Sequence, residues 1–374
     1  MELSRRTVLA ATLGALLSST AALPALAADA DAMLAQLAGK VLSLGPNGEQ
    51  PQPAASISLT SDELAQIKAK HATAAIIMHY AGNDWSAAQI DGLKTQFAAM
   101  GIEVLGVTDA GFKPEKQVAD IETMLAKKPS IIVSIPTDPV ATAVAYKKAV
   151  SLGVKLVFMD NVPKGLEAGK DYVSIVSADN YGNGVASALL MAKALGGKGN
   201  IGVVYHAADF FVTQQRYTAF KKTIIDNFPD IKIVAEQGIG GPNFSGDAER
   251  AAGAMITANR KLNGIWAVWD VPAEGVISAA RSVGADKLVI TTCDLGANVA
   301  INIAQGSYTK GLGAQRPYDQ GVTEALLAGY GLLGKPAPAY VAWSALPVSR
   351  DNLADAWQQV YHKPLPDDVK NSMQ

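Results

Sequence analysis

The stretch AIIMHYAGNDWSAAQIDG, residues 75–92, passes from an apolar run through a polar loop into a helical pattern. The apolar run Ala75–Met78 predicts a strand, and either Asp84 or Ser86 is expected to cap the helix by accepting a hydrogen bond from a first-turn N–H. In an open α/β sheet, ligands are held by the loops beyond the carboxyl ends of the strands. We therefore predict that Trp85, in this loop, covers one face of a small ligand.

The rest of the chain repeats this alternation of apolar strands and amphipathic helices. Strands are predicted near residues 74–80, 102–107, 130–135, 155–159, 200–206, 231–237, 263–269, 288–293, 309–314 and 341–346. Helices are predicted near residues 86–99, 115–127, 139–151, 180–194, 212–227, 246–258, 273–283, 296–305 and 318–333. Continuous apolar strands between helices predict parallel sheets covered by helices on both faces. These strands are too many for a single hydrophobic core, so a break between two domains is expected near residues 177–180.

Composition excludes one class of function. The 374 residues are 49% hydrophobic and 18% charged, with a formal net charge of −2. A chain without a basic block has nothing to neutralise phosphates, so no nucleic-acid partner is expected. Cys293 is the only cysteine, which leaves no intramolecular disulfide, and its apolar surroundings predict a buried core thiol rather than a nucleophile.

The N-terminus has the pattern of an export signal. Arg5 and Arg6 precede a soft apolar run, Thr7–Leu23, and a small-residue cleavage site that ends at Ala27. The run is short and rich in Ala and Thr, which favours a cleaved signal over a membrane anchor. Residues Ser4–Leu9 resemble a twin-arginine signal. We predict a signal peptide over residues 1–27, cleaved after Ala27, and an exported protein.

Polar and aromatic side chains gather where the predicted strands end. Asp160 and Asp294 each follow an apolar strand directly, so each carboxylate is expected to be partly buried and to need donors, which sugar hydroxyls can supply. The alternative is that each caps the following segment. Arg216 lies early in a helix that faces the loop ends, where a guanidinium can bond two oxygens at once, or it forms a surface ion pair. Trp269 is expected to lie either at the cleft or in the core.

Several weaker signals do not support a cofactor or a catalytic site. Gly197–Gly202 matches GxGxxG, but it follows a helix and opens a strand, the reverse of a dinucleotide loop. The four histidines have no metal-ligand spacing, and His79 and His206 are interpreted as satisfied side chains more readily than as cleft residues. No serine-hydrolase elbow or phosphate loop is present in the sequence. We therefore expect no cofactor, no metal and no enzyme activity, with an exported sugar-processing enzyme or oxidoreductase as the alternative.

Several segments, taken in order, resemble one known family. They are Ile76–Gly92, Ile131–Asp138, Leu156–Asn161, Ser177–Asn180, Arg216–Phe220, Cys293–Asp294 and Gly313–Pro317. Together they resemble the ribose-binding-protein family, the type I periplasmic sugar-binding proteins of ABC importers, over roughly residues 74–348. The resemblance places pocket positions on both halves of the chain: Asn83, Trp85, Ser86, Asp160, Asn161, Arg216, Asn243 or Phe244, Trp269, Asp294 and Gln315.

Four positions depart from the ribose-binder pattern. That pattern has asparagine at Ile135 and Trp269, arginine at Asn161, and phenylalanine at Cys293. The resemblance therefore implies a neutral monosaccharide or short polyol whose hydroxyls are fewer than those of ribopyranose, or differently placed.

The resemblance also implies a two-lobe fold, each lobe a parallel sheet flanked by helices in three αβα layers, hinged by three crossings. The first lobe would comprise residues 72–177 and 316–342, and the second residues 178–315 and 343–349. Residues 28–71 would form a linker with a short helix capped by Ser61, and residues 350–374 a tail. The implied role is a monomeric periplasmic receptor that delivers its ligand to an ABC permease. A receptor for a signalling partner, or a transcription regulator with the same fold, are the alternatives.

Overall fold

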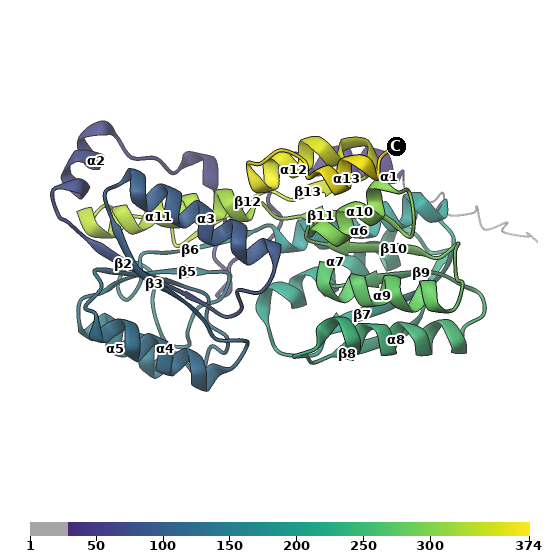
Figure 1. Ribbon diagram of the computed structural model, residues 1–374, viewed down its shortest axis with the longest axis horizontal. Helices are drawn as coiled ribbons and strands as arrows, with labels where there is room; N and C mark the ends of the chain where they lie inside the picture. Colours follow the sequence, from purple (N-terminus) through teal and green to yellow (C-terminus); the bar gives the residue numbers. More distant parts are fainter. Residues whose placement is uncertain (1–28) are drawn as a thin grey trace, which may run out of the picture.

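The computed structural model describes residues 29–374 as two α/β bodies, here called lobe 1 and lobe 2 (Figure 1). Lobe 1 is built on a seven-stranded sheet and lobe 2 on a six-stranded sheet. The predicted signal peptide, with its cleavage site after Ala27, lies outside the described residues. Within residues 29–374, no helix combines the length and apolar character needed to span a bilayer.

The sheet of lobe 1 is parallel throughout. Its strands lie in the order β1 (Gln52–Pro53), β12 (Tyr340–Trp343), β6 (Ser174–Ala178), β5 (Lys155–Met159), β4 (Ile131–Ser134), β2 (Thr73–Met78) and β3 (Glu103–Asp109). Side chains of a strand point alternately to the two faces. In β2, Ala74, Ile76 and Met78 pack into one buried cluster, whereas Ala75 and Ile77 pack into another. Both faces of this strand are therefore buried, as its continuous apolar sequence predicts.

Helices cover both faces of the lobe 1 sheet. One face carries α2 (Ser61–Lys68), α3 (Asp84–Ala99) and α11 (Pro317–Leu333), and the other carries α4 (Pro114–Ala126) and α5 (Ala143–Ser151). A 3-10 turn, η1 (Ala54–Ser56), follows β1.

The sheet of lobe 2 is parallel except for its edge strand β13, which is antiparallel to β11. Its strands lie in the order β13 (Leu346–Val348), β11 (Thr309–Ala314), β10 (Val289–Cys293), β9 (Leu262–Ala267), β7 (Gly199–His206) and β8 (Ile231–Ile239). One face is covered by α1 (Ala30–Leu37), α6 (Asn180–Leu195) and α7 (Phe211–Asn227). The other is covered by α8 (Phe244–Ala258), α9 (Asp270–Ser282), α10 (Ala297–Ala304) and α12 (Leu353–Tyr361).

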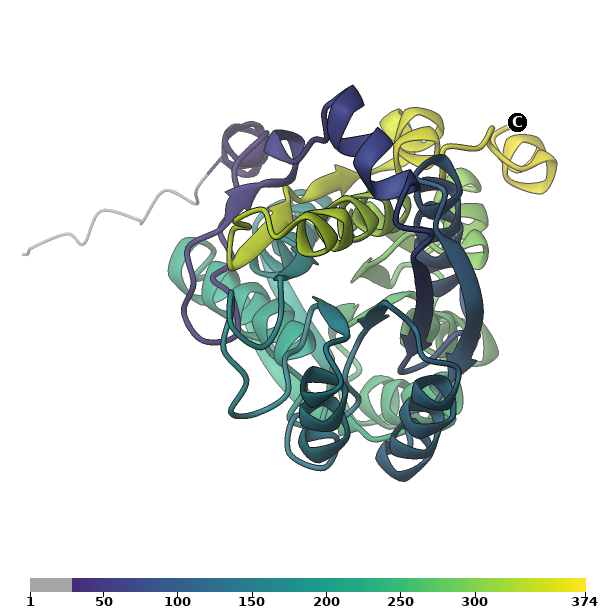
Figure 2. The same cartoon turned by 90° about the vertical axis from the view of Figure 1, so that its left-hand side faces the viewer.

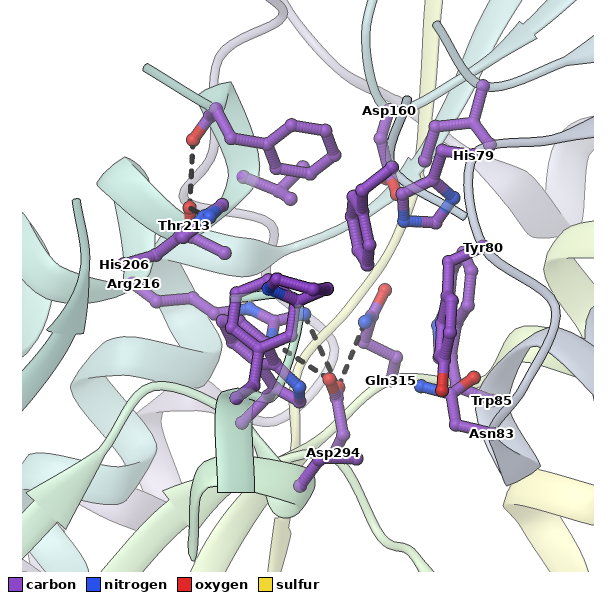
Figure 3. Close-up of a pocket in the computed structure, with 18 of the residues that line it drawn as sticks. His79, Tyr80, Asn83, Trp85, Asp160, His206, Thr213, Arg216, Asp294 and Gln315 are labelled. Carbon is purple, nitrogen blue, oxygen red and sulfur yellow. Dashed lines mark hydrogen bonds and ion pairs between the residues drawn. The ribbon is translucent and has the colours of Figure 1, made fainter. Parts of the chain in front are cut away.

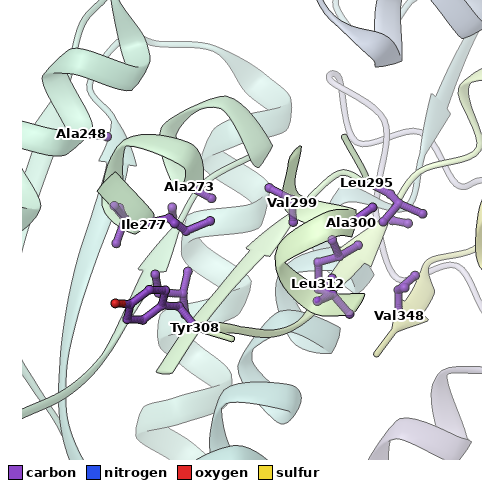
Figure 4. Close-up of a cluster of buried hydrophobic side chains, with 14 of the residues drawn as sticks. Ala248, Ala273, Ile277, Leu295, Val299, Ala300, Tyr308, Leu312 and Val348 are labelled. Atoms are coloured by element: carbon purple, nitrogen blue, oxygen red, sulfur yellow. The ribbon is translucent and has the colours of Figure 1, made fainter. Parts of the chain in front are cut away.

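The core beneath these last helices is shown in Figure 4, and Ile277, Val299 and Leu312 from three elements belong to this one cluster. Residues 350–374 contribute to this core through α12, and through Val369 of α13 (Asp367–Asn371), after a 3-10 turn, η2 (Arg350–Asn352). Cys293 is buried, as predicted. The predicted alternation of strands and helices is confirmed.

Four local predictions were wrong. Strand β6 was not predicted, and the predicted strand 341–346 is two short strands, β12 and β13, in different sheets. Helix α3 is capped by Asn83, whose side chain accepts a hydrogen bond from the Ser86 N–H, rather than by Asp84 or Ser86. Helix α2 is capped by Thr60 in a reciprocal capping box with Glu63, rather than by Ser61.

Residues 38–51, here called the N-terminal strap, connect α1 on lobe 2 with β1 at the edge of the lobe 1 sheet. The purple ribbon of Figure 2 follows this path. The backbone N–H groups of Leu42 and Ser43 and the Ser43 hydroxyl each donate to the Asp179 carboxylate at 2.8 Å. Asp179 also caps α6 by accepting from the Gly182 N–H at 2.8 Å. The strap therefore adds a fourth connection between the lobes to the three that the sequence predicts.

Candidate functional site

A cavity of about 240 Å³ lies between the lobes, where the carboxyl ends of the strands of both sheets converge (Figure 3). Most of the site residues predicted from the sequence line it together, from both lobes. These are Asn83, Trp85, Asp160, Arg216, Asn243, Trp269, Asp294 and Gln315.

Two predicted site residues are turned away from the cavity. The Ser86 hydroxyl donates to the Tyr80 carbonyl oxygen at 2.7 Å, which ties the start of α3 to the loop before it. The Asn161 side-chain amide donates to the Pro136 carbonyl oxygen at 3.1 Å. Both side chains are buried, and in this arrangement neither faces a ligand in the cavity. They are better described as groups that hold the loops of lobe 1 in place.

A continuous chain of hydrogen bonds, here called the polar edge, runs along the cavity, which is lined by its members Asp160, Arg216 and Asp294. Ser177 donates to Asp160 at 2.6 Å, and Asn180 donates to the Ser177 oxygen at 3.2 Å. Arg216 Nε donates to the Asn180 amide oxygen at 2.8 Å. The polar edge therefore joins the two lobes through the first residue of α6. Asn180 was not predicted as a site residue, although it lies in the segment quoted for the domain break.

Arg216 and Asp294 form the charged centre of the polar edge. Arg216 Nη1 and Nη2 donate to the two carboxylate oxygens of Asp294 at 2.9 and 3.3 Å, and both side chains are buried. Gln315 Nε2 donates to Asp294 Oδ1 at 2.9 Å. Such a bidentate pair holds both groups rigidly. The guanidinium charge is thus neutralised within the protein, and a further Arg216 N–H stays available.

Asp160 occupies a different electrostatic environment. Burial raises its pKa to about 6, although the Ser177 hydroxyl and the Arg216 guanidinium act in the opposite direction. Only Asp160 Oδ1 is engaged by Ser177. Above pH 6, the carboxylate therefore presents acceptor capacity toward the cavity.

Aromatic side chains form much of the remaining wall, here called the ring wall, and sequence reasoning found only part of it. Its members are His79, Tyr80, Trp85 and Phe112 from lobe 1, and His206, Phe210, Phe244 and Trp269 from lobe 2. Phe112 was missed altogether. It has a left-handed backbone, φ +59°, and its N–H donates to the His79 carbonyl oxygen at 2.7 Å. The one feature of the sequence that could have indicated Phe112 as a cavity residue is its place in a loop beyond the carboxyl end of β3.

The lobes touch each other on more than one side of the cavity. The Asp84 carboxylate in lobe 1 accepts a hydrogen bond from the Ala297 N–H in lobe 2 at 2.8 Å. The rings of Phe112 and Phe244 lie 5.4 Å apart across the cleft. The segment after α12 reaches lobe 1 through His362, whose ring lies 2.8 Å from Asp319. These contacts describe a closed arrangement of the two lobes.

Comparisons with known proteins agree with this architecture. A family model described as a periplasmic binding protein domain matches residues 74–336. The ribose import binding protein of Bacillus subtilis is 26% identical over 204 residues, which are 53% of this chain and 62% of that protein. The D-ribose/D-allose-binding protein of Pseudomonas aeruginosa is 27% identical over 216 residues, 56% of this chain and 66% of that protein. The chain thus spans slightly less than two thirds of the length of these curated relatives.

Among solved structures, a periplasmic solute-binding protein of an ABC transporter from Actinobacillus succinogenes, with bound D-allose, has a similar fold. Its TM-score is 0.69 at 24% identity, and the match covers 76% of this chain and 99% of that one. The two-lobe α/β fold expected from the sequence is thereby confirmed.

Proposed function

Because the chain belongs to the periplasmic binding protein domain family, we propose that it is the solute-binding receptor of an ABC-type import system. In this proposal it captures a neutral monosaccharide or short polyol between two closing lobes. The observation that carries the proposal is the cavity between the lobes, with hydrogen-bonding groups from both sheets converging on it. The names of the relatives, which bind ribose or allose, support a sugar as the ligand.

The polar groups around the cavity suit hydroxyl groups, which both donate and accept. Asp160 and the Gln315 carbonyl oxygen can accept, and the remaining Arg216 N–H can donate. Within the described residues, Gln315 Oε1 and Trp85 Nε1 are buried without a hydrogen-bond partner. A buried polar atom without a partner is costly, so a ligand that bonds these atoms gains affinity. The Trp85 and Trp269 rings would cover the C–H faces of the same ligand.

The charge balance of the cavity favours an uncharged ligand. Its charged lining consists of one guanidinium, Arg216, and two carboxylates, Asp160 and Asp294. Because Asp294 already neutralises Arg216, a phosphorylated sugar would meet an excess of negative charge. The affinity for the correct ligand is expected to be micromolar or tighter, roughly −8 kcal/mol.

The remaining parts of the proposal concern the setting of the receptor. Residues 1–27 would direct export by the twin-arginine route and be removed, which leaves a monomer in the periplasm. The lobes would consist of residues 72–177 with 316–342, and 178–315 with 343–349. The closed form would dock on an ABC permease of the inner membrane. Closure about segments that join two domains is a common way to enclose a ligand.

A thermal-shift screen of the exported, processed protein tests this function. Neutral sugars, polyols and sugar phosphates are compared, and each compound that raises the melting temperature is then titrated by calorimetry. The expected result is a neutral sugar or polyol with a micromolar or lower dissociation constant. Tight binding of anionic compounds with no response to any neutral sugar or polyol would overturn the proposal.

A further inference from the structure

The ring wall runs across the cleft from one lobe to the other. The Phe112 ring lies 5.3 Å from Tyr80, 4.7 Å from His79 and 5.4 Å from Phe244, between ring centroids. On the lobe 2 side, Phe244 lies 4.9 Å from Trp269. His79 stacks on Phe210 across the cleft, at 5.7 Å and an angle of 13°. Rings from both lobes thus form a connected, largely apolar part of the cavity lining.

The two histidines of this wall are uncharged at neutral pH. Burial lowers the pKa of His79 to about 3, with a further contribution from His206, and burial lowers the pKa of His206 to about 4. The Thr213 hydroxyl donates to the Phe210 carbonyl oxygen at 3.0 Å, so it can only accept from His206 Nδ1, 3.1 Å away. His206 therefore adds an aromatic ring to the wall and no charge.

Polar groups are few in the part of the ring wall formed by Phe112, Phe210 and Phe244, whereas two other atoms of the wall, His79 Nδ1 and Trp85 Nε1, are buried without a hydrogen-bond partner within the described residues. Ile135 lines the cavity, and the neighbouring amide of Asn161 is directed to the Pro136 carbonyl oxygen. A ligand hydroxyl pointing at these three phenylalanine rings would lose its bonds to water and find few replacements. A methyl group or an unsubstituted carbon in the same place would be favoured by the apolar surface.

We infer that the ligand is a neutral sugar or polyol with an apolar end, a deoxy or alkyl-bearing compound, bound with its hydroxyls on the polar edge and its apolar end against the ring wall. This inference rests on the proposed function and narrows its substrate class. A methyl or methylene group in such a pocket changes affinity by about 10- to 200-fold. The deoxy or alkyl compound is therefore expected to bind at least about tenfold tighter than its fully hydroxylated counterpart.

Calorimetry with matched pairs of compounds tests the inference on the exported, processed protein. The pairs are D-fucose and D-galactose, L-rhamnose and L-mannose, and methyl β-D-ribopyranoside and D-ribose. Phe112→Ala is measured beside Phe211→Ala, a matched control that lies next to Phe210 but does not line the cavity. Thermal unfolding of both variants verifies that they fold.

The expected result is at least a tenfold preference for the apolar member of one pair, reduced to less than threefold in Phe112→Ala and retained in Phe211→Ala. Binding of the hydroxylated member as tightly or more tightly in every pair would overturn the inference and leave the proposed function standing. No binding of any of the six compounds, together with no hit among neutral sugars and polyols in the wider screen, would overturn both.

Discussion

Asp160 of lobe 1 and Asp294 of lobe 2 are structural equivalents. Each is the first residue after a parallel strand of its lobe, β5 or β10, and each has a left-handed backbone, with φ of +56° and +64°. Each also donates its N–H to the next strand, to Val176 O at 2.9 Å and Gly313 O at 3.0 Å. Aspartate tolerates this conformation better than most residues. The same backbone arrangement thus delivers one carboxylate to a hydroxyl partner and the other to a guanidinium.

The raised pKa of Asp160 predicts a pH-dependent stability. Its pKa is about 6 in the folded protein against an ordinary 3.8, so the folded state holds the proton more firmly than the unfolded state. Ionisation of Asp160 therefore lowers the free energy of unfolding progressively as the pH rises from about 4 to 6. Above pH 6 the full reduction is about 3 kcal/mol. Asp160→Asn should raise the free energy of unfolding of the unliganded protein at pH 7.5 and change it little at pH 4. Urea unfolding at both pH values measures this, and an equal difference at both would contradict it.

The Arg216–Asp294 pair predicts an asymmetric effect on stability. Asp294→Ala leaves a buried guanidinium without its counter-charge, which should lower the free energy of unfolding by about 3–5 kcal/mol. The double variant Arg216→Met with Asp294→Leu removes both charges and should recover most of this loss. Chemical unfolding of the single and double variants provides the test. A double variant no more stable than Asp294→Ala would show that the pair is not the cause.

Both aspartates are expected to accept hydrogen bonds from ligand hydroxyls in their ionised form. Replacing either by alanine should cost roughly 2–4 kcal/mol of binding, because the partners of a buried charged group are left unpaired. Titration calorimetry above pH 7 with the best neutral ligand measures the loss for each folded variant. An affinity within twofold of wild type would remove that residue from the site.

The strands, helices and pocket loops follow from the sequence because their signals are local. Continuous apolar runs mark buried parallel strands, and polar residues directly after them mark the cavity. The direction in which a side chain points is not determined by the local sequence pattern, because it depends on backbone conformation and on partners distant in the chain. The left-handed backbone of Asp160 is followed by Asn161, whose amide bonds Pro136 instead of facing the cavity. Phe112 likewise reaches the cavity because its backbone is left-handed, a conformation that the local sequence does not predict.

The missed elements have a similar physical origin. Strand β6 (Ser174–Ala178) overlaps residues 177–180, where the break between two domains is expected, and its sequence SIVSA contains two serines and is not a continuous apolar run. Strands β12 and β13 are separated by two residues and belong to different sheets, a division that the hydrophobic pattern alone does not show. Helix caps were misplaced by one to three residues because Asn, Asp, Ser and Thr are all good caps and the sequence offers several together.

Closure of the lobes predicts a change in overall size. The contacts between Asp84 and Ala297, and between Phe112 and Phe244, belong to the closed arrangement. Without ligand, the lobes are expected to spend time apart, since the empty cavity leaves buried polar atoms without partners. Small-angle scattering should therefore give a smaller radius of gyration with saturating ligand than without. An unchanged radius would contradict hinge closure.

Asp179 is predicted to be important for stability although it lies outside the cavity. Asp179→Ala removes the cap of α6 and the acceptor for two N–H groups and one hydroxyl of the strap. The loss of a cap and of partners for part-buried donors should lower the free energy of unfolding by roughly 2–4 kcal/mol. Denaturant unfolding measures this, with Ser43→Ala as the control, which removes the hydroxyl bonds to Asp179, Gln215 and the Tyr181 N–H but keeps both backbone bonds of the strap to Asp179. A loss no larger than that of Ser43→Ala would show that the helix cap and the two backbone bonds to Asp179 do not add to stability.

The strap also bears on the mechanics of opening. Its bonds to Asp179 lie where β6 leads into α6, and the Asp179 N–H donates to the Trp343 carbonyl oxygen at 2.8 Å, beside another crossing of the chain. Connections that run side by side at a pivot resist torsion more strongly than they resist bending. We therefore expect the two lobes to open and close by rotation about a single axis that passes through these connections. Rings of the ring wall that face each other across the cleft, such as Phe112 and Phe244, would then separate on opening and return to the same contacts on each closure.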